Sequence, residues 1–363
     1  MRSFLMGDRQ SQSQLTPAAV CRILDANLDR AREGLRIVEE WCRFGLNSTE
    51  LTDECKQMRQ TLAQWHDSQL REARDTPGDP GVELTHPQEA KRENVEGVLG
   101  ANLCRIEEAL RVLEEYGKLY HPQMGEACKQ MRYRVYTLDS RLLTFGRHQK
   151  LQEARLYLVT SESDKLLEIV EGALQGGLTL VQYRDKNADD LTKVETGIKL
   201  RQLCHRYDAL FLMNDRVDLA LAVGADGVHL GQQDVPIAFA RQLLGQARII
   251  GRSTTNPEEM QRAIDEGADY IGVGPVYDTP TKPGKSAAGL EYIRHAAEHS
   301  PIPWFAIGGI DMNRLPDVVS AGAGRLAVVR AIMEAAQPTL VTQYFLSQLT
   351  MNETLRRLRS ASQ

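Results

Sequence analysis

The chain has 363 residues and a formal net charge of −5, and its composition is 42% hydrophobic and 26% charged. These values are typical of a folded globular protein. The length is enough for two ordinary domains or for one large barrel with an extension. The sequence has no basic stripe, which argues against nucleic acid as a partner, and no apolar run that is long enough to cross a membrane.

Six cysteines are spread along the chain without a C-x-x-C pair, at positions 21, 42, 55, 104, 128 and 204. Such spacing does not fit a zinc site, and the residues around each cysteine resemble helix faces. Reduced, partly buried thiols are usual in the cytosol, so we expect a cytoplasmic protein.

Up to about residue 150 the sequence is helical in character, and it repeats itself. Ala26-Asn27-Leu28 recurs 75 residues later as Ala101-Asn102-Leu103, and Cys55–Arg59 recurs 73 residues later as Cys128–Arg132. Self-similarity of this kind is typical of duplicated helical units that pack on each other. We therefore predict an all-α helical domain over residues 1–150, made of two copies of one unit.

A set of polar residues belongs to the repeat. In the first copy it comprises Asn27, Arg30, Glu33, Arg36 and Glu40. Arg and Glu residues three or four apart pair readily on a solvated helix face, and this is the favoured interpretation. Because the residue types repeat, and not only the charges, a paired ligand site is kept as the alternative.

After Leu151 short apolar runs alternate with amphipathic helical stretches. The eight predicted strands are Arg155–Thr160, Leu178–Arg184, Ala209–Asn214, Gly227–Leu230, Ile249–Arg252, Tyr270–Gly274, Trp304–Gly308 and Leu326–Val329. Eight strands alternating with helices predict a parallel (β/α)8 TIM barrel over residues 151–363, an α/β fold. The alternative is a doubly wound open sheet, but no G-x-G-x-x-G follows the first strand.

Polar residues follow the second predicted strand, where a barrel has its active site. Gln182, Arg184 and Lys186 alternate along the chain and should share one face. Two cations and an amide on one face favour a bound anion, because burying them unpaired is costly. An ion pair with a carboxylate of a neighbouring strand is the alternative.

Two carboxylates follow the next two strands. Asp215 comes after Asn214 at the end of the third strand, and Asp234 comes shortly after the fourth. Paired carboxylates without a nearby Cys or ligating His suit magnesium, which would bridge to a diphosphate. Each aspartate alone could instead cap a helix. We expect His229, within the fourth strand, to be a packed barrel residue.

The remaining strand ends also carry groups that bind anions. Ser253 offers a hydroxyl after the fifth strand, with helix capping as the alternative. The loop after the sixth strand, 276–285, is unusually long for a barrel and contains Thr279, Thr281 and Lys282. The seventh and eighth strands end in glycines and in a helix start, which predicts a phosphate cup. The residues of this cup are Gly308, Gly309, Val329 and Arg330.

Several of these stretches resemble thiamine phosphate synthase, from Arg155 to about Ile332. The matching stretches are VQYRDK, NDRVDLALAVGADGVHLGQQD, GRSTT, ADYIGVGPVYDTPTKPG, AIGGI and AVVRAI. Members of that family join hydroxymethylpyrimidine diphosphate to a thiazole phosphate and release pyrophosphate. The match is specific, since each motif follows a different strand in the same order.

The resemblance implies a role for each candidate residue. Magnesium would be held by Asp215 and Asp234, and Arg184, Lys186 and Lys282 would stabilise the charge on the leaving pyrophosphate. The pyrimidine diphosphate would contact Gln182, Tyr183, Arg184, Asp185, Lys186, Asn214, Ser253 and Lys282. The thiazole phosphate would contact Thr279, Pro280, Thr281, Gly309, Val329 and Arg330.

Two residues depart from the family pattern. Thr255 stands where the family often has histidine, and Arg330 stands where serine is common. A metal-independent thiazole phosphate isomerase and a non-catalytic sensor of thiamine precursors are the competing functions. The metal and diphosphate residues favour the synthase, because the related tautomerases typically lack that set.

The helical half resembles an extension that is fused to some members of the family, beginning RILDANLDRAREGLRIVEEWCRF. The resemblance implies a pyrimidine monophosphate kinase, but the segment has no Gly-rich nucleotide loop. A structural or dimerising role is at least as well supported, and a homo-oligomer stays open.

Overall fold

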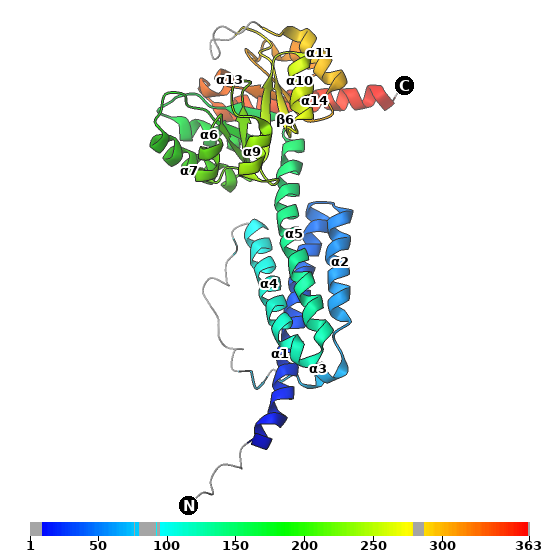
Figure 1. The fold of residues 1–363 in the computed structure, drawn as a ribbon. Helices are drawn as coiled ribbons and strands as arrows, with labels where there is room; N and C mark the ends of the chain where they lie inside the picture. The colour runs from blue at the N-terminus through cyan, green and yellow to red at the C-terminus, as the bar shows by residue number, and fades with distance from the viewer. Residues whose placement is uncertain (1–8, 76, 80–91, 93–94, 279–286, 362–363) are drawn as a thin grey trace, which may run out of the picture. The chain divides into compact units, whose positions relative to one another are not determined.

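The computed structural model describes residues 9–75, 77–79, 92, 95–278 and 287–361 (Figure 1). The chain divides into two compact units, residues 1–142 and 143–363. Among the described helices, none has both the length and the apolar character that a membrane span requires.

The first unit is helical, as the sequence predicts (Figure 1). The repeat corresponds to two helix pairs, since α1 and α4 carry the two Ala-Asn-Leu motifs while α2 and α5 carry the two Cys–Arg motifs. The elements are α1 (Arg9–Glu40), a π-helical turn (Trp41–Gly45), α2 (Thr49–Ala63), α3 (Ser68–Glu72), α4 (Val95–Tyr120) and α5 (Pro122–Glu153), which runs on into the second unit.

Apolar residues at helical spacing form the core of this unit. The periodic leucines of both copies are buried together: Leu28, Leu35, Leu103 and Leu110. Gly34 lies where α1 and α4 pack, and a Cβ there would come within 2.7 Å of the Ile106 side chain. The missing side chain therefore lets the two repeated helices approach closely.

The polar residues of the repeat make contacts within the helical unit. Asn27 and Asn102 each donate to a backbone carbonyl four residues earlier, at 2.8 and 2.7 Å. Arg36 and Arg111 each pair with glutamates three and four residues later. The Arg–Glu pairs are those of the favoured interpretation, a solvated helix face, whereas Asn27 and Asn102 are buried.

One carboxylate of each copy also joins two helices. Glu39 of α1 is 5% exposed and receives a hydrogen bond from Arg59 of α2 at 2.6 Å. Glu114 of α4, also 5% exposed, receives one from Arg132 of α5 at 3.1 Å. The repeated Glu and Arg therefore hold each helix pair together in the same way.

The second unit is a closed barrel of eight parallel strands in the order β1 to β8, as the sequence predicts. The strands are β1 (Leu156–Val159), β2 (Leu180–Tyr183), β3 (Leu210–Asn214), β4 (Gly227–Leu230), β5 (Ile249–Thr254), β6 (Tyr270–Val273), β7 (Trp304–Ile307) and β8 (Leu326–Val328). Pairing of β1 with β8 through Leu156 and Leu326 closes the sheet, so the open doubly wound sheet is excluded.

Helices surround the strands (Figure 1). They are α6 (Leu166–Gln175), α7 (Asp190–Arg206), α8 (Val217–Val223), α9 (Ile237–Leu244), α10 (Pro257–Asp265), α11 (Gly289–His299), α12 (Leu315–Ser320), α13 (Arg330–Met333) and α14 (Pro338–Ala361). A large apolar core lies between strands and helices, and a smaller one fills the barrel interior. The interior core includes Tyr157, Tyr270 and Phe305.

The last turns of α5 pack on the amino ends of the strands. Leu151 and Ala154 belong to the interior core. Arg147 bonds to Asp226, which precedes β4, at 2.9 Å, and His148 bonds to Asp269, which precedes β6, at 3.0 Å. These contacts explain why the compact units divide after residue 142, whereas the sequence predicts a domain boundary after residue 150.

Asp226, at the amino ends of the strands, accepts three hydrogen bonds, as many as Asp269 does. Its carboxylate, 5% exposed, accepts from His205 at 2.9 Å, from the Phe211 backbone N–H at 3.0 Å and from Arg147. Burial by itself raises the pKa of Asp226, but the hydrogen bond from His205 and the charges of His205 and Arg147 outweigh burial and lower it. The charged carboxylate therefore stabilises the folded barrel.

We expect Asp226→Asn to lower the free energy of unfolding of the barrel by about 3 kcal/mol, because buried partners lose their counter-charge. Because the folded pKa lies below the unfolded value of about 3.9, this contribution is present above that pH and is lost as pH falls through the folded pKa. Urea unfolding, followed by hydrogen exchange of barrel peptides, measures the change.

Asp208→Asn is the matched control. Asp208 pairs with Lys150 of α5, the helix that also carries Arg147, but the Asp208 side chain is 84% exposed. Asparagine tolerates the positive φ of 56° at this position. The control should unfold almost like the parent chain. If both variants have the same free energy of unfolding, the buried network around Asp226 contributes nothing to the stability of the barrel.

Candidate active site

The carboxyl end of β2 brings cationic groups to the mouth of the barrel. Gln182 lies within β2 and is 2% exposed, whereas Lys186 beyond the strand end is exposed. The Arg184 backbone is fixed by Thr160 after β1, whose Oγ1 accepts from the Arg184 N–H at 2.9 Å. Within the part of the chain that the structure describes, neither Arg184 nor Lys186 forms an ion pair. The charge of Lys186 nevertheless acts on Asp215, the carboxylate at the end of the neighbouring strand β3 (Leu210–Asn214), so the alternative of an internal ion pair stays open.

Two other predicted residues of this segment have contacts of their own. The Asp185 carboxylate accepts from the backbone N–H groups of Asn187 and Ala188, each at 2.9 Å, and so shapes the turn after β2. Tyr183 belongs to the core between strands and helices, where burial raises its pKa. Both nevertheless line a cavity at this end of the barrel.

Asp215 and Asp234 come together after β3 and β4. Burial raises the pKa of Asp215 to about 6, and the hydrogen bond with Asp234 and the charge of Asp234 add to this, while Asn214 and Lys186 oppose it. The cap of α8 is Arg216 and that of α9 is Pro236, so neither aspartate caps a helix. The two carboxylates are therefore close enough to share a proton or a cation.

The loop that carries Asp234 is anchored from β5, which the sequence analysis missed. Arg252 is 7% exposed and donates through Nη1 to the Gly231 carbonyl at 2.7 Å. Gln232 of the same loop donates to the Ser253 carbonyl at 2.7 Å. The one available signal was a charged residue inside the otherwise uncharged run IIGRST.

Two cavities open at the carboxyl ends of the strands. The first, about 280 Å³, contains Gly309, Val329 and Arg330 among its lining residues. The second, about 270 Å³, is bordered by Lys186, Asn214 and Asp215, together with Tyr183 and Asp185. Most described residues of the two predicted anion sites thus line two separate cavities, with Ser253 in the first. Gln182, Arg184 and Asp234 line neither cavity.

Glycines form one wall of the first cavity. Gly308 and Gly309 have φ of 106° and 66°, in the left-handed region that favours glycine. A Cβ at Gly308 would lie 2.5 Å from Pro275, so the backbone needs the missing side chain. Arg314 donates to the Gly309 carbonyl at 2.8 Å and holds the bend in place. Backbone N–H groups there are thereby available to an anion.

Thr255 and Ser253 contact different side chains. Thr255 donates from its hydroxyl to Glu259 at 2.9 Å and from its backbone N–H at 2.7 Å. Asn256 caps α10, so Ser253 does not, and its Oγ lies 2.9 Å from His229 Nε2. Thr279, Pro280, Thr281 and Lys282 lie outside the described residues.

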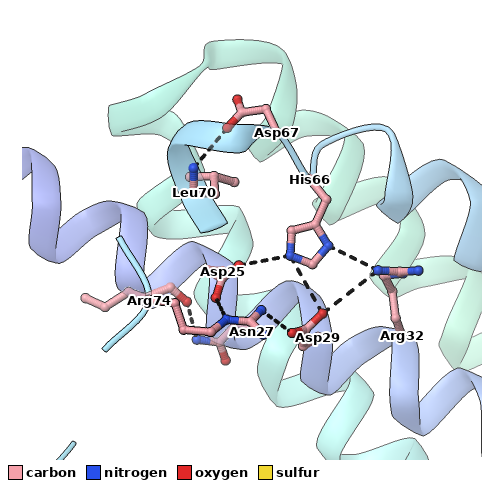
Figure 2. A network of polar contacts seen from close by, with 9 residues as sticks. Asp25, Asn27, Asp29, Arg32, His66, Asp67, Leu70 and Arg74 are labelled. Atoms are coloured by element: carbon pink, nitrogen blue, oxygen red, sulfur yellow. Dashed lines mark hydrogen bonds and ion pairs between the residues drawn. The ribbon is translucent and has the colours of Figure 1, made fainter. Parts of the chain in front are cut away.

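A second cluster of polar groups lies in the helical unit (Figure 2). One oxygen or nitrogen from each of Asp25, Asp29 and His66 lies within 4.8 Å of the others, a spacing that could hold a metal ion. However, Arg74 bonds to both carboxylates, reaching Asp25 at 2.6 Å, and Arg32 bonds to His66 Nδ1 at 3.1 Å. The two cations already offset the two carboxylates.

This cluster belongs to the first copy of the repeat alone. At the spacing of the Ala-Asn-Leu motifs, Gly100 and Cys104 stand where Asp25 and Asp29 would recur. Hydrogen bonds from Arg74 and His66 lower the pKa of Asp25, although burial acts in the opposite direction. We interpret the cluster as an ion-pair network that ties α1 to the segment after α2.

The barrel and its mouth define the general class of this protein. A closed parallel barrel that gathers carboxylates, cations and two cavities at the carboxyl ends of its strands is the arrangement of a barrel enzyme acting on small anionic molecules.

Comparison with known proteins specifies the class. The sequence matches the family described as "Thiamine monophosphate synthase" over residues 156–332 and the ThiD2 family over residues 22–141. The thiamine-phosphate synthase of Nostoc sp. is 68% identical over 95% of this chain and 98% of its own, and that of Synechocystis sp. is 66% identical over 93% and 98%. The chain belongs to the thiamine-phosphate synthase family, and it is a transferase.

A solved structure agrees with this assignment for the barrel. The thiamine phosphate pyrophosphorylase from Pyrococcus furiosus superposes with a TM-score of 0.51 at 39% identity, and covers 56% of this chain and 98% of its own. The similarity to this archaeal structure therefore extends over little more than half of the chain.

We expect Arg252→Ala to loosen the loop that carries Asp234, because the Gly231 carbonyl loses its buried donor. Amide exchange in residues 231–235 should quicken about tenfold, the change for the loss of one hydrogen bond to a charged group. Hydrogen-exchange mass spectrometry measures it, with Arg262→Ala on the exposed face of α10 as control. Unchanged exchange in the loop would mean that Arg252 does not anchor it.

Proposed function

We propose that the barrel condenses 4-amino-2-methyl-5-hydroxymethylpyrimidine diphosphate with 4-methyl-5-(2-phosphoethyl)thiazole, giving thiamine phosphate and pyrophosphate with the help of magnesium. The observation that carries the proposal is the Asp215–Asp234 pair beside Asn214 and Lys186. The family of the chain supports the same reaction.

The carboxylate pair fits magnesium by the chemistry of its donors. Asp215 and Asp234 offer only oxygen atoms, which are the ligands that this hard cation prefers. Burial, together with the hydrogen bond and the like charge of Asp234, raises the pKa of Asp215, and a divalent cation would relieve the repulsion between the two carboxylates. When bound, magnesium would supply a positive charge against the leaving pyrophosphate.

The cations of β2 would bind the diphosphate. Arg184 and Lys186, which have no ion-pair partner among the described residues, are available to meet phosphate oxygens. Lys282, for which we predict the same role, lies outside the described residues. As negative charge grows on the leaving group, these fixed cations stabilise it.

The reaction requires charge stabilisation more than proton transfer. The bond between the pyrimidine methylene carbon and the diphosphate oxygen breaks, and its electron pair leaves with pyrophosphate. The thiazole nitrogen then gives its lone pair to the carbon, forming the new C–N bond. The protein has to hold the nitrogen in line and keep water away from the cation.

The first cavity suits the thiazole phosphate. Gly308 and Gly309 turn the backbone there, and Arg330 at the start of α13 lines the same space. Arg330 differs from the serine that is common in the family, but an arginine binds phosphate through several N–H groups. We therefore interpret this departure as a variation of the site.

A metal-independent isomerase and a sensor stay the competing functions of the barrel, and the kinase and structural roles stay predictions for the helical unit. We also propose a cytoplasmic location. It is supported by the six cysteines, which are all free and of which only Cys104 is exposed.

The decisive experiment measures pyrophosphate release by the purified chain with both substrates and magnesium. We expect release, matched by thiamine phosphate formation, only when both substrates and the metal are present. Omission of either substrate and addition of EDTA are the controls. Binding of both substrates without release would favour the sensor, and conversion of a thiazole phosphate in EDTA would favour the isomerase.

Asp215→Asn tests the metal site separately. Asparagine tolerates the φ of 61° at this position. Without a divalent cation we expect a higher Tm than that of the parent chain, because the repulsion from Asp234 is removed. Magnesium should raise the Tm of the parent chain and not that of the variant. Full magnesium-dependent activity of the variant would refute the assignment.

We expect Arg330→Ala to raise the KM for the thiazole phosphate at least tenfold, because one hydrogen bond to a charged group contributes about 1.5–3 kcal/mol. The KM for the pyrimidine diphosphate should stay the same. Steady-state kinetics with each substrate varied in turn measures the two KM values separately. Equal changes in both constants would contradict the separate phosphate site.

A further inference from the structure

A continuous chain of hydrogen bonds crosses the interior of the barrel. Gln182 Nε2 lies 2.6 Å from the Tyr157 hydroxyl, which lies 2.8 Å from the Tyr270 hydroxyl. The Tyr270 hydroxyl lies 2.8 Å from His229 Nδ1, and His229 Nε2 lies 2.9 Å from Ser253 Oγ. Five strands (β2, β1, β6, β4 and β5) thus each contribute one polar side chain to a single path.

The residues that form this chain of hydrogen bonds are buried and closely packed. Tyr270 is fully buried, Tyr157 is 2% exposed and His229 is 8% exposed. The Tyr270 ring lies over Gly251, where a Cβ would come within 2.1 Å of the ring. Phe305 packs edge-on against both tyrosines. These contacts leave the rings little freedom to rotate, so the order of the hydrogen bonds is fixed.

The Gln182 end of the chain of hydrogen bonds favours one direction of donation. An amide nitrogen can only donate, so Gln182 donates to the Tyr157 oxygen. We assign the one hydrogen of Tyr157 to the Tyr270 oxygen and that of Tyr270 to His229 Nδ1, because each hydroxyl then donates its hydrogen within the chain of hydrogen bonds. A neutral imidazole whose Nδ1 accepts carries its hydrogen on Nε2, so His229 donates to Ser253 Oγ. Donation therefore runs one way, from β2 to β5.

We infer that Tyr157, Tyr270 and His229 are positioning residues whose one-way hydrogen-bond chain fixes the Gln182 amide at one side of the site and the Ser253 hydroxyl at the other. The inference rests on the proposed function, in which the two end residues hold the pyrimidine diphosphate. The three residues between them act through these ends.

The direction of hydrogen-bond donation determines which atom of Gln182, at one end, and of Ser253, at the other, faces away from the chain of hydrogen bonds. With Nε2 tied to Tyr157, the Gln182 amide cannot turn over, and its carbonyl oxygen becomes an acceptor in a fixed place. With Oγ accepting from His229, the Ser253 hydroxyl directs its hydrogen to a group other than the imidazole. A substrate group that donates near β2 therefore meets an acceptor that is already oriented for it.

Tyr270→Phe breaks the chain at its centre and keeps the ring that fills the barrel. We expect the KM for the pyrimidine diphosphate to rise about tenfold, as the two ends lose their fixed orientation. The KM for the thiazole phosphate should stay unchanged. A purely structural role would not separate the two constants.

Tyr292→Phe is the matched control. Tyr292 of α11 is also buried, and its hydroxyl donates to Thr254 Oγ1 at 2.7 Å, outside the chain. The control loses one buried tyrosine hydroxyl from the same barrel, and we expect both KM values to equal those of the parent protein. If the two variants have the same kinetics, the positioning role is wrong.

The direction of donation has a spectroscopic test that does not depend on turnover. In protein labelled with ¹⁵N-histidine, long-range ¹H–¹⁵N correlation reports which ring nitrogen carries hydrogen, and His229→Gln identifies the resonance. We expect the neutral tautomer with hydrogen on Nε2. Hydrogen on Nδ1, or on both nitrogens, would overturn the proposed direction.

These results also separate the inference from the proposed function. If the parent protein releases no pyrophosphate, the function fails, whatever the tautomer of His229. If the parent protein is active and Tyr270→Phe behaves like Tyr292→Phe, only the inference fails.

Discussion

The close approach of Asp215 and Asp234 is the interaction on which the mouth of the barrel depends. The two carboxylates are half-buried, and both desolvation and the neighbouring charge of Asp234 raise the pKa of Asp215. Such a pair persists only where the surrounding backbone holds it. Arg252, itself buried, provides part of this support by fixing the loop that carries Asp234. In the proposed function, this pair of carboxylates is held ready for a cation by a residue that lines neither cavity.

Local patterns in the sequence predicted the barrel well. Each strand is a short apolar run between polar segments, and each predicted strand overlaps an observed one. Eight such runs are compatible with few folds, because parallel strands need helical crossovers and eight strands readily close into a barrel. The strand ends also follow from order alone, so residues such as Lys186, Asp215 and Arg330 could be assigned to the mouth before any coordinates.

Contacts between distant strands could not be predicted in the same way. Tyr157 and Tyr270 are 113 residues apart and looked like ordinary apolar strand residues, yet their hydroxyls meet inside the barrel. Likewise, Arg252 gave no sign that its partner would be the Gly231 carbonyl. Tyr157 and Tyr270 meet across the barrel interior from β1 and β6, which are not neighbours, whereas the partner of Arg252 depends on the register of β4 and β5. The periodicity of a single strand carries no information on either. The sequence therefore predicted residues at the mouth of the barrel but not the contacts that orient them.

The hydrogen-bond network at the amino ends of the strands, which we call the barrel floor, lies at the opposite end of the barrel from the candidate site. Asp226 and Asp269 bind the end of α5 at the amino ends of the strands, whereas the site occupies the carboxyl ends. Mutations at the floor should therefore change how much folded protein a cell accumulates, and mutations at the mouth should change what each folded molecule does. A variant library scored once for abundance and once for growth without thiamine would separate the two ends of the barrel into two populations. Compensating changes could then be selected at one end without disturbing the other.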